Sequence, residues 1–247
     1  METVYWSAAY MAHAALRHWL QLSPQSASKS KTDEPQQQQQ QQQQSRQSEP
    51  PARHIIFTSS VLAFFPVAGY APYTPAKTAM KALSDTLVQE IAMHNAQNQQ
   101  AGSWKHDAKR KDEQQQQQQP SPPIKIHSLF PMGILTPGYS YENTLKPSLT
   151  LQLEKDDRPQ PPDEVARIAI ARLEKGGRGG GGDVYLITTS WIGDLLRGIG
   201  MAGSVRNGFG IVDSLLAVVG AVVGSFLVRD FMGKCRKWGG GGERMDK

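Results

Sequence analysis

The sequence predicts an α/β protein whose core is one half of a doubly wound parallel sheet. Three short runs of apolar and β-branched residues have the length and composition of buried strands. Each run follows a segment whose apolar residues recur at helical spacing, which gives an alternating order of helix and strand. That order is typical of crossover units, and only about half of the units in a complete doubly wound sheet are present.

Two glutamine tracts, at residues 36–44 and 114–119, interrupt this pattern. They lie in inserts at about residues 24–51 and 97–121, which hold too few apolar residues to offset the entropy of ordering. We therefore expect both inserts to be disordered. Both fall between a helix and the following strand, whereas ligands bind beyond the carboxyl ends of strands, so the tracts should face away from the ligand site.

The formal net charge of +5 does not by itself indicate a nucleic-acid partner. Lys and Arg are scattered except at residues 105–111, inside an insert, and at residues 234–237. The single cysteine, Cys235, excludes an internal disulfide and suits a reducing compartment. The histidines lack the spacing of metal ligands, so we expect no metal site, and polar residues interrupt the first apolar run, which argues against a signal peptide.

The first three predicted elements are a helix, a strand and a second helix. Residues 54–59 are apolar and β-branched and form the strand. A loop with prolines and Gly69 then leads into a helix over about residues 73–93. The first helix covers residues 4–20, with one apolar stripe made by Val4, Ala8, Met11, Ala12, Ala15 and Trp19.

The following elements are two more strands with a helix between them. Residues 124–130 form the second strand, which Pro131 ends. Asp163 is a suitable N-cap for a helix that should end at the glycines from Gly176 onward. Residues 183–188 form the third strand.

Residues 209–228 form an apolar segment with one charge, Asp213, followed by a basic, Gly-rich tail at 229–247. About twenty residues are enough to cross the hydrocarbon core of a bilayer. We expect a membrane-associated helix, which could span the membrane or be interfacial or re-entrant. The alternative is a buried dimerisation helix, which would make the protein a homo-oligomer. The basic residues that follow favour a cytosolic C-terminus.

Tyr73 and Lys77 lie four residues apart on one face of the second helix. Alone, this spacing is weak evidence for a catalytic pair, because such a Tyr and Lys more often lie together simply as an aromatic ring packed on a lysine stem. The context strengthens it, since Ser59 and Ser60 end the first strand, at the edge of the sheet where ligands bind.

The strand with its double serine, followed by Tyr73-x-x-x-Lys77, resembles the short-chain dehydrogenase/reductase family. The resemblance implies a Rossmann-like fold, of which residues 1–208 would form a partial domain. It also implies that Tyr73 donates a proton to a ketone oxygen, that Lys77 lowers the pKa of Tyr73 and holds the nicotinamide ribose, and that Ser60 hydrogen-bonds the substrate oxygen. For Ser59 we expect a structural hydrogen bond.

The loop after the second strand, at residues 131–138, is similar to the loop that surrounds the nicotinamide in this family. It implies contacts from Pro131, Gly133, the Ile134 backbone and the Thr136 hydroxyl, in addition to Tyr73 and Lys77; a simple Pro/Gly turn is the alternative. Two glycine-rich patterns, at residues 176–182 and 198–203, do not connect a strand to a helix, so we reject them as dinucleotide-binding loops.

Within the family, residues 5–10, 137–147 and 162–166 resemble the fungal enzymes of sphingolipid biosynthesis that reduce a long-chain keto-amine. This implies reduction of 3-ketosphinganine to sphinganine with NADPH, at the endoplasmic-reticulum membrane and on its cytosolic face. Four aromatic residues either line the path of the lipid or pack in the core: Phe64, Phe65, Tyr139 and Trp191.

The chain lacks the Gly-x-x-x-Gly-x-Gly loop and the first strands of the family, and Val4 stands where the family has an active-site asparagine. Three interpretations follow. The chain is an incomplete copy of a reductase, or an inactive chain that binds a partner, or an active short-chain reductase that acts on another lipid or steroid ketone.

Overall fold

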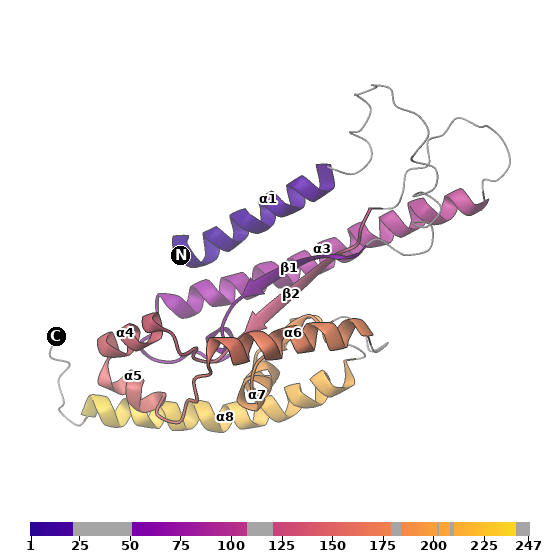
Figure 1. Cartoon of the computed structure of the whole chain (residues 1–247). Coiled ribbons are helices and arrows are strands. Elements are labelled where there is room, and N and C mark those ends of the chain that lie inside the picture. The colour runs from indigo at the N-terminus through magenta and orange to yellow at the C-terminus, as the bar shows by residue number, and fades with distance from the viewer. Residues whose placement is uncertain (22–50, 108–120, 179–183, 202, 208–209, 241–247) are drawn as a thin grey trace. The chain divides into compact units, whose positions relative to one another are not determined.

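The computed structural model describes residues 1–21, 51–107, 121–178, 184–201, 203–207 and 210–240 (Figure 1). The chain divides into two compact units. The first comprises residues 1–8, 56–86 and 127–247, and the second comprises residues 9–55 and 87–126. Both glutamine tracts lie outside the described residues, so their predicted disorder stays a prediction.

The sheet has three strands in the order β1-β2-β3, with β1 at Arg53–Thr58, β2 at Ile124–Phe130 and β3 at Leu186–Thr188. Strands β2 and β3 are parallel, with Ser128 opposite Leu186. The first two predicted strands are confirmed to within a residue. The third is shorter than predicted, because the backbone N–H groups of Tyr185 and Leu186 donate to the Asn207 Oδ1 atom, at 2.7 and 3.0 Å.

The N-terminal helix is confirmed: a short π-helix, η1 at Glu2–Trp6, continues into α1 at Ser7–Gln21. Helix α3 covers Tyr73–Asp107, so it extends well beyond the predicted end near residue 93. The reason is tertiary, because the Asn95 side chain accepts from the Ile124 N–H and donates to the Ile124 carbonyl at the start of β2. Helix α3 thus includes residues 97–107 of the insert that was predicted to be disordered, and the disorder of the rest of that insert stays a prediction.

Helix α6 covers Pro162–Arg178 and differs from its prediction at both ends. Asp163 lies in the first turn instead of at the N-cap, where its charge still favours the positive end of the helix dipole. The helix continues through Gly176 and Gly177, since a glycine costs a helix only about 1 kcal/mol.

Four short elements were not predicted: the 3-10 helix η4 at Val61–Ala63, and helices α4 at Pro137–Leu145, α5 at Ser148–Leu153 and α7 at Trp191–Ile199. Two of the helices, α4 and α7, begin after an N-cap residue that can be recognised in the sequence. The Thr136 hydroxyl caps α4 and Pro137 occupies its first turn, and the Ser190 hydroxyl caps α7 by accepting from the Gly193 N–H at 3.0 Å.

Unit 1 has a dense apolar centre on β2 and β3. Phe130, Leu186, Ile187 and Met201 are at most 1% exposed, and the Phe130 ring packs on Phe64, with 4.3 Å between the ring centroids. The polar groups beside this centre are paired: Ser84 Oγ lies 2.9 Å from Tyr185 Oη, which donates to Asp85 at 2.8 Å. Buried polar groups with partners carry little penalty.

Helix α8, at Ile211–Gly240, packs against α7 through glycines (Figure 1). A Cβ atom on Gly198 would lie 2.3 Å from the Leu216 carbonyl oxygen, and one on Gly220 would lie 2.7 Å from the Gly198 carbonyl carbon. The backbones of the two helices therefore touch. Gly198, the first glycine of the rejected pattern at residues 198–203, serves helix packing, which agrees with that rejection.

The charge of Asp213 does not face outward, as a lipid-facing charge would. Its side chain is 3% exposed, pairs with Arg197 at 3.0 Å and accepts from the Asn207 N–H at 2.7 Å. The one acidic residue in the apolar segment thus belongs to the contact between α8 and α7.

We predict that Gly220→Ala destabilises the protein by about 1–3 kcal/mol, because the added methyl group must push α8 away from the backbone of α7. The matched control is Gly233→Ala in the same helix, where a Cβ meets nothing within 4 Å. That change should leave stability unaltered or raise it by up to about 1 kcal/mol. Thermal unfolding measures both, and equal melting temperatures for the two variants would contradict the glycine contact.

Candidate active site

The predicted catalytic residues meet at the carboxyl end of β1. Ser60 follows this strand and is 8% exposed, and its Oγ atom accepts from the Leu62 N–H at 3.2 Å, which caps η4. A serine hydroxyl that accepts at its oxygen keeps its own proton for donation. Ser60 is therefore held in place and can still donate a hydrogen bond to a ligand.

Two hydrogen bonds connect the first turns of α3 to the end of β1. The Lys77 Nζ atom donates to the Thr58 carbonyl oxygen at 2.9 Å, and the Ser59 hydroxyl donates to the Lys77 carbonyl oxygen at 3.0 Å. Ser59 is 2% exposed and makes the structural hydrogen bond that the sequence led us to expect. The strand end thus fixes the helix turn that carries Tyr73 and Lys77.

Burial sets the protonation of Tyr73 and Lys77. Burial raises the pKa of Tyr73 above its usual value; a hydrogen bond with Ser60 lowers it, and the Glu142 charge raises it further. Burial also lowers the pKa of Lys77, whose Nζ atom lies 5.5 Å from the centroid of the Tyr73 ring. Burial is the largest influence on the pKa of Tyr73, so the expectation that the Lys77 cation lowers this pKa stays a prediction. Tyr73 is a neutral phenol at neutral pH, which is the form that donates a proton.

The loop after β2 lies in the same site. Its backbone pairs with Gln160: the Leu135 N–H donates to the Gln160 carbonyl at 2.9 Å, and the Gln160 N–H donates to the Gly133 carbonyl at 2.8 Å. A Cβ on Gly133 would approach Tyr139 to 3.1 Å and Pro159 to 3.2 Å, so this close packing favours glycine. The loop is more firmly held than a simple Pro/Gly turn.

Thr136 has a structural role in addition to the predicted one. Its Oγ1 atom accepts from the Tyr139 N–H at 3.1 Å as the N-cap of α4. The hydroxyl proton is still available for a ligand. The predicted contact with a nicotinamide carboxamide is compatible with this cap.

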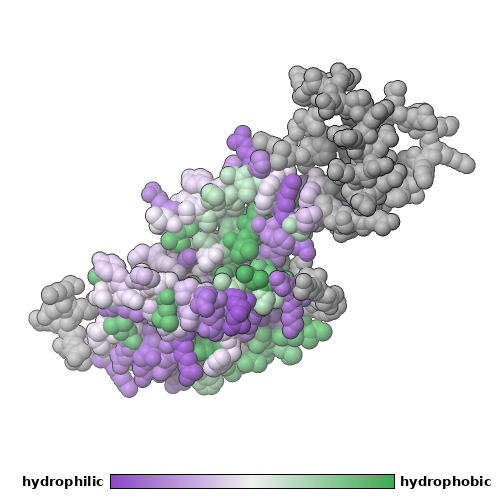
Figure 2. All heavy atoms as spheres, in the orientation of Figure 1, coloured by the Kyte–Doolittle hydropathy of each residue, from purple (hydrophilic) through white to green (hydrophobic). Residues whose placement is uncertain are grey.

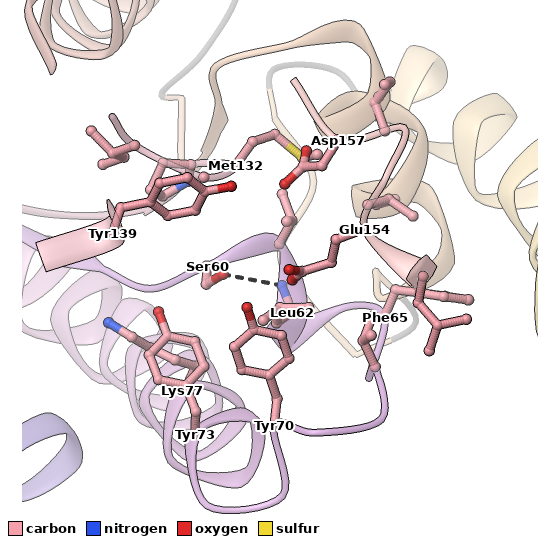
Figure 3. A pocket seen from close by; sticks show the side chains of 18 of the residues that line it. Ser60, Leu62, Phe65, Tyr70, Tyr73, Lys77, Met132, Tyr139, Glu154 and Asp157 are labelled. Carbon is pink, nitrogen blue, oxygen red and sulfur yellow. Dashed lines mark hydrogen bonds between the residues drawn. The ribbon is translucent and has the colours of Figure 1, made fainter. Parts of the chain in front are cut away.

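All of the predicted site residues line one cavity of about 760 Å³: Ser60, Tyr73, Lys77, Pro131, Gly133, Ile134 and Thr136. Figure 3 shows the side chains of Ser60, Tyr73, Lys77 and Tyr139 around the same space. The sequence elements that carry these residues are far apart, and the parallel order of β1 and β2 brings them together.

The four predicted aromatic residues divide between core, surface and cavity. Phe65 and Tyr139 line the cavity. Phe64 packs in the core against Phe130, and Trp191 is 73% exposed. Only two of the four can therefore contact a ligand there.

The sequence did not indicate a charged group on the opposite wall, which α4, α5 and their connections supply. Lys146, 5% exposed, pairs with Glu154 at 2.9 Å and with Glu142 at 3.3 Å. The Tyr70 hydroxyl donates to Glu142 at 3.1 Å. The pKa of Tyr70 is raised, mainly by burial and in addition by Glu154 and Glu142. Asp157 completes the group. Glu142 and Lys146 lie four residues apart in the chain, so a local pattern could have suggested their pairing, but no local pattern connects them with Glu154 or Asp157.

Helix α8 closes one side of the cavity through Leu227, Asp230, Phe231 and Lys234. The Phe231 ring meets Phe65 edge to face, with 5.2 Å between centroids. Of the four α8 residues in this wall, only Leu227 belongs to the segment predicted to associate with a membrane, at residues 209–228. The other three lie in the predicted basic tail, through which α8 continues to Gly240.

Known proteins resemble this chain along most of its length. The 3-ketodihydrosphingosine reductase of Aspergillus fumigatus is 40% identical over 239 residues, which cover 97% of this chain and 54% of the relative. The enzymes of that name from Neurospora crassa and Cryptococcus neoformans var. neoformans are 32% and 29% identical and are covered over 51% and 48% of their length. This chain is a homologue of the fungal 3-ketodihydrosphingosine reductases.

The homology agrees with the resemblance to short-chain reductases that Ser60, Tyr73 and Lys77 suggested. The chain spans about half the length of the curated relatives it matches. No model of a protein family matches it, and neither does a solved structure. A reductase of this kind uses a nicotinamide cofactor, and the cavity offers donors of the right type for its nicotinamide end: the Lys77 ammonium, the Tyr73 phenol and the Thr136 hydroxyl.

We predict that Lys146→Gln lowers the free energy of unfolding by about 1–2 kcal/mol at pH 7, since it leaves Glu142 and Glu154 without their shared cation. Lys155→Gln, an exposed lysine beside Glu154, is the control and should change little.

The effect of Lys146→Gln should depend on pH in one direction. The pKa of Lys146 is raised, because the two glutamates outweigh burial, so its stabilisation is complete below the usual lysine value of about 10.4 and is lost above it. The difference in melting temperature between the native protein and Lys146→Gln should be constant from about pH 6 to 9 and shrink above about pH 10.5. A difference that grows with pH would refute the assigned ion pairs.

Proposed function

We propose that this protein reduces 3-ketosphinganine to sphinganine with NADPH, a step of sphingolipid biosynthesis. The observation that carries the proposal is that Ser60, Tyr73 and Lys77 line one cavity together with the loop after β2. The names of the homologous fungal enzymes supply the substrate. The runner-up, a short-chain reductase for another lipid or steroid ketone, would use the same residues.

The reaction adds one hydride and one proton across the ketone. Tyr73, neutral at pH 7, donates the proton to the carbonyl oxygen as that oxygen gains negative charge. Ser60 donates a hydrogen bond to the same oxygen from its fixed position at the end of β1. The buried Lys77 ammonium stabilises the phenolate that remains on Tyr73.

A reduced nicotinamide would supply the hydride to the carbonyl carbon. Lys77, Gly133, the Ile134 backbone and Thr136 would hold its ribose and carboxamide, together with Pro131, as the family resemblance implies. The preference for NADPH over NADH is part of the proposal and rests on that resemblance alone.

Helix α8 would hold the protein at a membrane. Among the described residues, one helix, Ile211–Gly239, is long and apolar enough to cross a membrane by length and composition. Figure 2 shows hydrophobic residues along the edge where α8 lies. The exposed apolar residues of its first half are Ile211, Val212, Leu215, Val218, Val219, Val222 and Phe226.

We propose that α8 lies in the plane of the membrane instead of crossing it. Its other face packs on the rest of unit 1 along much of its length, at Asp213, Gly220, Gly224 and Phe231. A spanning α8 would have to take α7 and the buried Asp213–Arg197 pair into the bilayer, which is costly. The endoplasmic reticulum and its cytosolic face are the location that the family resemblance implies.

The decisive test of the reaction is Tyr73→Phe, which should abolish reduction of 3-ketosphinganine and spare NADPH binding, because only the proton donor is removed. Loss of NADPH absorbance measures turnover, and fluorescence of bound NADPH measures binding. The control is Tyr141→Phe in α4, which removes the same hydroxyl from a residue that is 67% exposed and should keep full turnover. Turnover by Tyr73→Phe above about 1% of the native rate would exclude the assigned role.

Membrane binding is tested with Val218→Glu, which places a charge in the exposed apolar face of α8. We expect co-sedimentation with phospholipid vesicles to fall severalfold, since a carboxylate is costly to bring into an apolar layer. Leu145→Glu is the control, because this residue is equally exposed (67% against 66%) but lies at the end of α4. Similar losses for both variants would show that α8 is not the contact.

A further inference from the structure

Asp157 is a carboxylate in the cavity that has no direct ion pair among the described residues. Its Oδ1 atom accepts from the Arg158 N–H at 2.9 Å, and the Gly133 backbone also hydrogen-bonds it. Within the part of the chain that the structure describes, no lysine or arginine side chain forms an ion pair with it. The side chain is half-buried, so water replaces the missing partner only in part.

Three of the other acids of the cavity, unlike Asp157, form an ion pair with a lysine. Glu142 and Glu154 share Lys146, and Asp230 pairs with Lys234 at 2.6 Å. Lys77 is directed to the Thr58 carbonyl. The lysines that line the cavity are therefore engaged elsewhere, and Asp157 is left to a ligand.

The electrostatic balance of the cavity favours a positively charged ligand. The described lining includes five carboxylates against two lysines, although the whole chain carries a formal charge of +5. Burial is the largest influence on the pKa of Asp157 and raises it, and the Glu154 charge raises it as well. The backbone hydrogen bonds from Arg158 and Gly133 and the Lys146 charge lower this pKa without reversing the shift. A cation beside Asp157 would stabilise the charged carboxylate, which burial disfavours.

The proposed substrate has a cation at the right place. In 3-ketosphinganine a primary amine, protonated at neutral pH, is bonded to the carbon next to the carbonyl carbon. If the carbonyl oxygen binds Tyr73 and Ser60, the ammonium must lie in the same cavity. Figure 3 shows Asp157 and Glu154 on the wall that faces Ser60 and Tyr73.

We propose that Asp157 binds the ammonium group of the long-chain amino ketone and so selects it over neutral ketones. This assignment rests on the proposed reaction. Glu154, three residues earlier, adds a second negative charge on the same wall. Asp157 is thus a specificity-determining residue, and it also fixes which way the ketone faces Tyr73.

A pair of lipids that differ only in the amine provides the test: sphinganine and 1,3-octadecanediol. Binding is measured by calorimetry at pH 7 in micelles of a neutral detergent. We expect the native protein to bind sphinganine at least about tenfold more tightly than the diol, as a charge-assisted hydrogen bond would provide. Asp157→Asn should remove this preference.

Asp156→Asn is the matched control, because the neighbouring acid is also in the lining but is exposed. It should retain the preference, and unfolding curves would establish that both variants are folded. Equal binding of the two lipids by the native protein would overturn the assignment without any variant. A preference that persists in Asp157→Asn would overturn it as well.

Turnover separates this inference from the proposed function. With 3-ketosphinganine, Asp157→Asn should raise KM at least about tenfold, whereas KM for 1-hydroxyoctadecan-3-one, which lacks the amine, should not change. If the native protein reduces neither ketone, the proposed reaction fails, and the binding preference is then judged by calorimetry alone. If it reduces both and Asp157→Asn leaves both KM values unchanged, only the role of Asp157 fails.

Discussion

The attachment of α3 to the end of β1 is the constraint on which the candidate active site depends. The bonds from Lys77 to Thr58 and from Ser59 to Lys77 fix the rotation of the first helical turns against the strand. Tyr73 lies one turn before Lys77, and Ser60 lies next to Ser59, so the hydroxyls of both proposed catalytic residues are positioned by the same two contacts. A small rotation of α3 would separate them, and effective catalysis tolerates little misplacement.

Desolvation then determines what these groups do. It raises the pKa of Tyr73 and lowers that of Lys77, so Tyr73 is a neutral phenol at neutral pH. On the opposite wall, Lys146 pairs directly with Glu142 and Glu154, whereas Asp157 has backbone hydrogen bonds and no direct ion pair among the described residues. In the proposed reaction, one side of the cavity would supply a proton and the other would favour a positive charge.

The sequence predicted what local pattern and order along the chain can determine. Strands β1 and β2 were clear because short β-branched runs leave few alternatives, and Ser60, Tyr73 and Lys77 lie on or directly beside such elements. The loop at Pro131–Thr136 followed from its place after β2. The parallel sheet then brought these separate motifs into one cavity, as expected for ligands at the carboxyl ends of strands.

Other features depend on contacts between distant residues, which a local pattern does not contain. Asn95 extends the order of α3 by binding Ile124, and Asn207 shortens β3 by taking the N–H groups of Tyr185 and Leu186. Hydropathy identified α8 but not its orientation, because its packed face includes glycines and one paired acid, which score as neutral or polar, beside apolar residues such as Phe231. Lys146, Glu154 and Asp157 come from short helices and connections whose positions only the fold defines.

The places where the glutamine tracts enter the chain bear on how this gene can vary. Both tracts fall in the sequence ranges of unit 2 and precede the first residues of β1 and β2, whereas every residue of the candidate active site belongs to unit 1 and follows the last residues of these strands. Because the entropic cost of a connection rises only slowly with its length, natural selection on the catalytic residues would place little restraint on the number of glutamines.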